Sequence, residues 1–198
     1  MNLILDGEKG SLMQTDLAGK LLIAMPSLGD PRFDRSIILI CAHDESFAMG
    51  IVVNKPKLDL DLSDVLEQMD IDPPSLRASY PLLDGGPVGL ERGFVLHSPD
   101  RLFEDATVTV TDQICLTTSR DILETFPTDD CPDKAALALG YAGWGPGQLE
   151  NEILENAWIV GKPDDGLIFG EDHHAKWEQA LSKIGIDPGR LPSAAGRS

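Results

Sequence analysis

The stretch "ALGYAGWGPGQLENE", residues 138–152, places an apolar segment, four glycines and an acidic segment in direct succession. Many proteins hold a nucleotide phosphate with a strand, a glycine-rich turn and a helix in this order. The dinucleotide fingerprint G-x-G-x-x-G fails here, because Gln148 or Glu150 stands where the third glycine is required. Glu150 and Glu152 would also neutralise the positive end of the helix and repel a phosphate. We therefore interpret the stretch as a strand, a tight turn and a helix without a phosphate site.

The turn also predicts where the helix begins. We expect Gly145 to be the N-cap, Pro146 to take the first helical position and other glycines to supply positive φ angles. Residues 135–144 fit a helix or a strand by periodicity, and the glycines and aromatics that end them favour a strand. Residues 148–156 then form a short helix, and residues 157–161 form a further strand.

Strand-like segments recur along the chain. The run SIILICAH, residues 36–43, is almost continuously apolar, which predicts a strand covered on both faces. A turn separates it from residues 47–54, its expected hairpin partner. The other predicted strands lie within residues 17–26, 82–88, 92–98, 107–112 and 113–119.

Three helices besides residues 148–156 are expected, at residues 62–69, 120–126 and 173–185. The first follows from apolar residues at helical spacing. The second has a start that resembles a capping box, formed by Thr118 and Asp121. The predicted inward-facing residues of the three are Leu62, Val65, Leu66 and Met69, then Ile122, Leu123 and Phe126, then Trp177, Ala180, Leu181 and Ile184.

This order of elements predicts an α+β fold in a single domain. The chain has 198 residues, of which 42% are hydrophobic, and no internal linker is evident. We expect residues 1–16 to be a flexible arm, residues 17–186 to form the domain and residues 187–198 to be a flexible tail.

Charge and cysteine content limit the classes of function. Acidic residues outnumber basic ones by 33 to 16, so the net charge is −17, which disfavours binding to nucleic acid or to anionic membranes. No apolar run approaches the roughly 18 residues of a membrane span, and the N-terminus has no secretory signal pattern. The three cysteines contain no CxxC pair, which fits a reducing compartment. A cytoplasmic location is expected.

Enzyme motifs are sparse. Cys41 and His43 stand two apart on a predicted strand, so their side chains should share one face, where a thiol beside an imidazole could act as a nucleophile. The alternative is an inert buried cysteine. The chain contains no HExxH and no G-x-S-x-G, and we expect neither a metal nor a cofactor. Ser119 is interpreted as a helix cap.

The few basic residues suggest a different kind of site. Several lie at the ends of predicted strands or at a helix start, beside glycine or proline turns. If the fold gathers them, they form an anion-binding pocket; otherwise each makes a local salt bridge. The residues of this hypothesis are Arg35, Asn54, Lys55, Gly85, Gly86, Arg92 and Arg120.

Several long motifs together resemble one family. In chain order they are LIAMPSLGDPRFDRSIILICAH, FAMGIVVNKP, DGGPVGLERGFVLH, LTTSRDILE and ALGYAGWGPGQLENEILENAW. They resemble the YqgE/AlgH family of bacterial proteins over residues 17–185. The resemblance implies a bifurcated mixed sheet curled into a pseudo-barrel with flanking helices. It implies no established reaction, cofactor or catalytic residue, and the family name refers to a part in regulating alginate production.

For function, the sequence favours a non-enzymatic accessory or regulatory protein that binds a protein partner or a small anionic ligand. The alternative is an enzyme that uses Cys41 with His43 or a pocket centred on Arg120. A direct transcriptional regulator is a third class, which the net charge of −17 and the lack of a helix-turn-helix signature disfavour.

Overall fold

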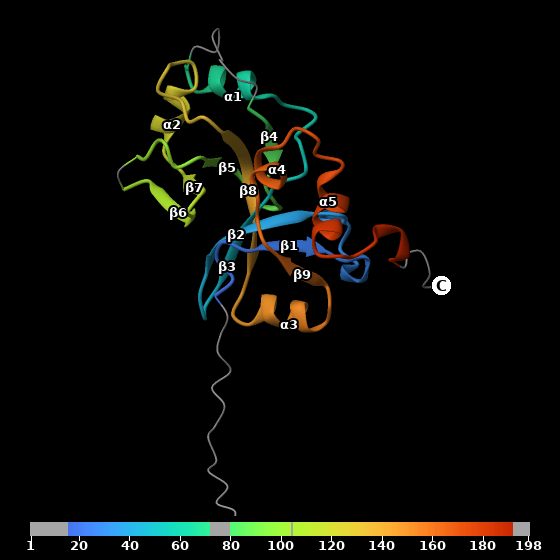
Figure 1. Cartoon of the computed structure of the whole chain (residues 1–198). Helices are drawn as coiled ribbons and strands as arrows, with labels where there is room; N and C mark the ends of the chain where they lie inside the picture. Colours follow the sequence, from blue (N-terminus) through green and yellow to red (C-terminus); the bar gives the residue numbers. More distant parts are fainter. Residues whose placement is uncertain (1–15, 72–79, 104, 192–198) are drawn as a thin grey trace, which may run out of the picture.

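The computed structural model of the chain describes residues 16–71, 80–103 and 105–191 (Figure 1). The strands are β1 (Leu21–Ala24), β2 (Ile37–His43), β3 (Ala48–Val52), β4 (Leu82–Asp84), β5 (Val88–His97), β6 (Thr107–Thr111), β7 (Ile114–Thr117), β8 (Ala135–Trp144) and β9 (Trp158–Gly161). The helices are α1 (Leu62–Gln68), α2 (Arg120–Thr125), α3 (Gln148–Leu154), α4 (Asp165–Phe169) and α5 (Lys176–Lys183), with 3-10 turns at Pro26–Leu28, Pro31–Phe33 and Pro188–Arg190.

One sheet contains all of these strands, in the order β6-β7-β5-β8-β3-β2-β1-β9, and β4 pairs separately with β8. The long β8 is shared by both halves of the sheet (Figure 1). Its first half pairs with β5 and, in parallel, with β4; its last residues pair with β3 instead. The sheet therefore divides along β8 and curls into a half-barrel flanked by helices, which confirms the predicted α+β fold.

Three glycines allow the division. Gly85 and Gly86, just after β4, cross β8 at Gly140 so closely that a Cβ on Gly85 would lie 2.3 Å from the Gly140 carbonyl oxygen. A Cβ on Gly86 would lie 2.2 Å from the Tyr141 carbonyl carbon. Gly86 and Gly140 also have φ angles of +146° and +75°, where a side chain is strained. At this crossing the backbone of Gly85 bonds to both β3 and β8, accepting from Val52 N and donating to Leu139 O.

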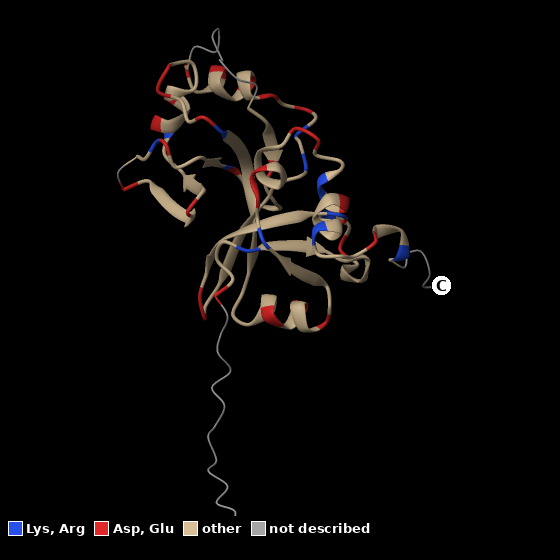
Figure 2. Ribbon diagram, viewed as in Figure 1, with Lys and Arg blue, Asp and Glu red and all other residues tan. Residues whose placement is uncertain are grey.

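The core has three parts, each beneath its own helices. One lies between the sheet and α4 and α5, a second packs against α3, and a third is covered by α1 and α2. The predicted inner face of α2 is confirmed, because Ile122, Leu123 and Phe126 are all buried. Asp and Glu residues mark helices and loops throughout the fold, while Lys and Arg are sparse (Figure 2).

Two predicted helix caps are wrong, although α2 and α3 begin at the predicted residues, Arg120 and Gln148. The N-cap of α3 is Gly147, with φ +67°, rather than Gly145, so Pro146 precedes the helix. The N-cap of α2 is Ser119, which makes no capping hydrogen bond through its side chain, so the capping box of Thr118 and Asp121 is absent. The short α4 was not predicted, because its five residues are too few to show a period.

The predicted ends of the chain are only partly within the described residues. Residues 187–191 include a 3-10 turn, and Leu191 packs against the core beneath α5. The rest of the predicted tail, nearly all of the predicted arm and residues 72–79 lie outside the described residues. None of the helices in the described residues combines the length and the apolar composition of a membrane-spanning helix.

The carboxylate of Glu152 links α3 to the last residue of β8 and the first residue of β9. Glu152 Oε2 accepts hydrogen bonds from the indole nitrogens of Trp144, at 2.9 Å, and Trp158, at 2.7 Å. Its other oxygen accepts from Gln148 Nε2 at 2.9 Å. The two tryptophan rings are buried and meet edge to face, with their centroids 6.0 Å apart. Glu152 is therefore the acceptor on which two buried indole N–H groups depend.

We expect Glu152→Ala to lower the free energy of unfolding by about 2–4 kcal/mol, because it leaves two buried donors without their acceptor. Urea denaturation measures the change. Glu155→Ala, on the same turn but exposed, is the matched control and should change stability by less than about 0.5 kcal/mol. Equal effects of the two substitutions would contradict the role assigned to Glu152.

Candidate functional site

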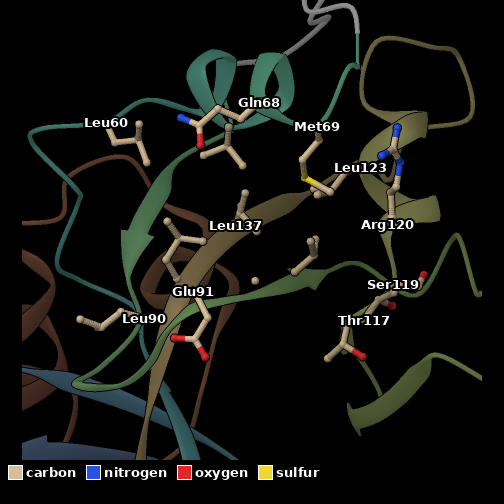
Figure 3. A pocket seen from close by; sticks show the side chains of 15 residues that line it. Leu60, Gln68, Met69, Leu90, Glu91, Thr117, Ser119, Arg120, Leu123 and Leu137 are labelled. Atoms are coloured by element: carbon tan, nitrogen blue, oxygen red, sulfur yellow. The ribbon is translucent and has the colours of Figure 1, made fainter.

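A cavity of about 440 Å³ lies on the concave side of the half-barrel, between α1, α2, β5 and β8 (Figure 3). We call it the half-barrel cavity. Residues from four separate segments line it: Leu60, Val65, Gln68, Met69, Leu90, Glu91, Gly93, Val95, Thr117, Thr118, Ser119, Arg120, Leu123, Leu137 and Leu139. Its volume falls within the range of about 300–1,000 Å³ that is typical of small-molecule sites.

The floor of the half-barrel cavity is apolar. Leu137 and Leu139 are two apart on β8, so they face the same side, and Val95 on β5 pairs directly with Leu137. Leu123 of α2 and Met69 after α1 close the cavity from the other side (Figure 3). Val95 and Leu137 are almost fully buried, whereas Leu139 and Met69 are partly exposed and contribute accessible apolar surface to the cavity.

Polar groups gather where β7 leads into α2. The Oγ of Ser119 is buried and has no hydrogen-bond partner among the described residues. Arg120 is exposed, and its Nε donates to Glu124 Oε1 at 2.7 Å, an i,i+4 ion pair on the helix surface. Gln68 and Glu91 lie on other walls of the cavity (Figure 3). Ser119, with its unpartnered hydroxyl, and Arg120 thus both line one end of an apolar hollow, and the Arg120 side chain extends away from Ser119 (Figure 3).

A buried histidine supports this end of the cavity. His97 Nδ1 lies 2.8 Å from the Ser98 carbonyl oxygen, which can only accept, so Nδ1 carries the proton. Burial lowers the pKa of His97, which favours the neutral ring, and its Nε2 accepts from Thr117 Oγ1 at 2.7 Å. Thr117 in turn accepts from Thr107 Oγ1 at 2.7 Å. Sequence reasoning missed this chain, because its members lie on three different strands.

Three residues of the anion-pocket hypothesis lie close together but are engaged locally. The side chain of Asn54 accepts from Ile37 N at 2.8 Å and donates to Arg35 O at 2.8 Å. Lys55 Nζ donates to the Arg32 carbonyl oxygen at 2.7 Å. The Arg35 guanidinium lies 5.2 Å from the ring centre of Trp177. These hydrogen bonds hold the segment after β3 against the segment that leads into β2.

The other four residues are placed elsewhere. Gly85 and Gly86 are buried at the β8 crossing. Arg92 lies 5.8 Å from the ring centre of Phe94 and lines a hollow near β3, while Arg120 lines the half-barrel cavity. The seven residues therefore do not line one shared cavity, and Arg120 is the member that lines the half-barrel cavity.

Cys41 and His43 do not share a face, contrary to the prediction. The β2–β3 register shifts between Ile40 and Ala42, so a β-bulge at Cys41 reverses the alternation. Cys41 points into the core beneath α5, whereas His43 pairs with Ala48 on the opposite side. His43 Nε2 instead bonds to Glu150 Oε1 at 2.7 Å.

The surroundings of Cys41 do not activate its thiol. Its Sγ donates to the Leu39 carbonyl oxygen at 3.5 Å, and burial raises its pKa to about 12. The carboxyl of Glu150 is partly desolvated, yet hydrogen bonds from its own backbone N–H and from His43 keep its pKa below the ordinary value. His43 and Glu150 therefore link β2 to α3, and neither contacts the thiol.

A buried lysine is a further feature that the sequence did not reveal. Lys176 on α5 is 1% exposed, and its Nζ donates to the carbonyl oxygens of Val53, at 3.0 Å, and Ile168, at 3.1 Å. Desolvation lowers its pKa to about 8. The pKa of the nearby His173 is lowered by burial and by the charge of Lys176. Lys176 joins the end of α4 to the segment after β3.

No group of three or more His, Cys, Asp or Glu residues in the described parts of the chain is placed to hold a metal ion. Among the residues that line the half-barrel cavity, Glu91 supplies the single carboxylate, and none is His or Cys.

Comparison with known proteins gives consistent matches over nearly the whole chain. The family model described as AlgH-like matches residues 21–189. A UPF0301 protein of Ruegeria pomeroyi is 50% identical over 92% of this chain and 100% of its own length. A UPF0301 protein of Nitrobacter hamburgensis is 48% identical over 98% of this chain and 93% of its own length.

Two solved structures align with nearly the whole chain. The solution structure of the AlgH protein from Pseudomonas aeruginosa aligns with a TM-score of 0.75 and 36% identity, over 93% of this chain and 97% of that chain. The crystal structure of protein DIP2367 from Corynebacterium diphtheriae aligns with a TM-score of 0.70 and 22% identity, over 92% and 93%. The second likeness concerns the fold alone.

We expect Cys41 to resist thiol reagents in the folded protein, because its thiol is buried and stays protonated. Labelling with 5,5′-dithiobis(2-nitrobenzoate) at pH 8 should proceed equally fast in the wild type and in Cys41→Ala until urea unfolds them. A fast-reacting thiol that is present in the wild type and lost in Cys41→Ala would contradict this expectation and restore the thiol-enzyme hypothesis.

The buried Lys176 predicts a specific pH dependence. The folded protein releases the Lys176 proton near pH 8, whereas the unfolded chain keeps it to about pH 10.5, so the unfolded state binds more protons between these values. The stability of the wild type relative to Lys176→Met should therefore rise from pH 7 to pH 10.5, by up to about 3 kcal/mol. Urea denaturation of both proteins across this pH range measures their difference in the free energy of unfolding. The contributions of all other titrating groups are common to both proteins and cancel in this difference. A constant difference would refute the assigned burial.

Proposed function

The chain belongs to the AlgH-like family, and from this premise we propose that it is a non-enzymatic accessory protein that binds a small amphipathic carboxylate in the half-barrel cavity. The observation that carries the proposal is that Ser119, whose Oγ has no hydrogen-bond partner among the described residues, and Arg120 both line one end of an apolar hollow. The three cysteines are free thiols, which supports a reducing, cytoplasmic setting.

The cavity suits a ligand with an apolar body. Val95, Leu137 and Leu139 form a continuous apolar floor, and Leu123 faces them from α2. Removing apolar ligand surface from water contributes roughly 25 cal/mol per Å², so a chain of several methylenes would supply most of the affinity. A fully polar ligand would leave this surface uncovered and gain little.

Arg120 and Ser119 favour a carboxylate as the head group. A guanidinium presents two parallel N–H donors that match the two oxygens of a carboxylate. The existing pair of Arg120 with Glu124 is exposed on both sides, so it contributes only about 0–1 kcal/mol and a ligand carboxylate can replace it. Ser119 Oγ is buried, and rotation of its side chain toward the cavity would give it the partner that it lacks within the described chain.

The lining residues support binding more than catalysis. None of them is His, Cys, Lys or Asp, and their single carboxylate, Glu91, is exposed. Nucleophilic catalysis requires a nucleophile and a base within hydrogen-bond reach, and the hydroxyl of Ser119 has no such partner. The cavity therefore supplies recognition without the groups that would activate a reaction.

We expect decanoate to bind the wild type and to shift the methyl signals of Leu123, Leu137 and Leu139 in NMR spectra. Arg120→Gln should weaken decanoate binding about tenfold or more, because a charge-assisted hydrogen bond contributes roughly 1.5–3 kcal/mol. Arg101→Gln is the matched control, since Arg101 is also half exposed and paired with an acid but lies outside the cavity. Decanol, which lacks the charge, should bind both proteins equally.

Two results would overturn the proposal. Decanoate could leave the cavity methyl signals unchanged, which would remove the cavity as its site. Decyltrimethylammonium could bind as tightly as decanoate, which would remove the role of Arg120 in selecting a carboxylate.

A further inference from the structure

A second hollow lies at the opposite edge of the sheet, between β9, β1 and α5, and has a volume of about 560 Å³. We call it the edge groove. Its floor is apolar and includes buried Leu21, Ile23 and Leu167. Its rim carries Lys20, Lys162 and Lys183. It shares no lining residue with the half-barrel cavity.

The edge groove is cationic in an acidic protein. The chain contains 16 basic and 33 acidic residues, yet three lysines and one acid, Asp164, line this groove. Lys183 pairs with Asp164, whereas Lys20 and Lys162 make no ion pair with the described residues. Basic residues are visible just before β1, just after β9 and on α5 (Figure 2). Two positive charges at the groove are therefore left for a partner.

The groove adjoins an open strand edge. β9 ends the strand order, and within the described chain it pairs only with β1. The backbone groups on its outer edge are available to a further strand. Val160 on β9 is 37% exposed and Ile184 beside α5 is 36% exposed, so apolar side chains accompany the open edge.

Lysines at a sheet edge also disfavour nonspecific strand pairing. The lysines therefore limit which strands can pair with β9. A second copy of this chain would bring Lys162 against lysines of the same groove, and like charges across an interface are unfavourable. An acidic strand meets no such penalty, because each of its carboxylates can face a lysine. The open edge of β9 accepts any strand, and charge complementarity favours an acidic strand over a second copy of this chain.

We propose that the edge groove binds an acidic, extended segment of a partner protein, which adds a strand to β9. The segment would alternate apolar and acidic residues, because successive side chains of a strand point to opposite faces. Its backbone would supply hydrogen bonds to β9, its apolar side chains would pack beside the exposed Val160 and Ile184, and its acids would meet Lys20 and Lys162. This surface is separate from the proposed ligand cavity.

The probe is a fluorescein-labelled peptide, acetyl-(Glu-Val)₄-amide, and the measurement is fluorescence anisotropy at low salt. We expect it to bind at least about tenfold more tightly than acetyl-(Lys-Val)₄-amide, and its affinity to fall as salt is raised. Lys20→Glu with Lys162→Glu should weaken binding at least about tenfold. Lys57→Glu with Arg101→Glu changes the net charge equally, outside the groove, and should change affinity less than about threefold.

Strand addition is separated from simple charge attraction by a second peptide, in which the valines are N-methylated and can no longer donate to β9. It should bind at least about tenfold more weakly, and only the unmodified peptide should slow hydrogen exchange of amides in Trp158–Gly161. Thermal melts confirm that each variant is folded. Equal affinity of both peptides, equal losses in both double variants, or no binding at 1 mM peptide would overturn the proposal.

Discussion

The close backbone crossing of Gly85 and Gly86 over Gly140 is the constraint on which the rest of the structure depends. It lets β4 and β3 occupy the same side of β8, one after the other, so that a single strand belongs to both halves of the sheet. Any side chain at Gly85 or Gly86 would enter the backbone of β8. The division of the sheet produces the curvature, and the curvature leaves the half-barrel cavity open beneath α1 and α2. A local absence of side chains thus sets the shape of the candidate site.

Much of the fold could be predicted from the sequence, because strands and helices report their own burial pattern. The run at 36–43 reads as a fully covered strand, and in the structure Ile37 to Cys41 are all buried. Local geometry that depends on neighbours was not predictable. The bulge at Cys41 arises from pairing with β3, and it places His43 on the face opposite to the one expected. Gly85 and Gly86 were candidates for an anion-binding pocket, whereas tertiary packing buries them.

The candidate site could be predicted only in fragments. Arg120 was recognisable as a basic residue at a helix start, and it does line the half-barrel cavity. The residues that line the cavity with Arg120 were not recognisable, because Val95, Leu137 and Ser119 come from segments that only the curled sheet brings together. Lys176 illustrates the same limit, since nothing in its sequence neighbourhood distinguishes a lysine that is 1% exposed from one on the surface. Sequence patterns reveal which face is apolar, and the fold decides where that face is left uncovered.

The distribution of the aromatic residues has a practical consequence for observing this protein in solution. The three tryptophans, Trp144, Trp158 and Trp177, all belong to the half of the molecule built on β1, β2, β3 and β9, and none lines the half-barrel cavity. Intrinsic tryptophan emission is therefore an optical reporter of one half only. A change in this emission when a ligand fills the cavity would therefore report coupling between the two halves, which share β8 and a common core that includes Leu39 of β2 and Leu96 of β5.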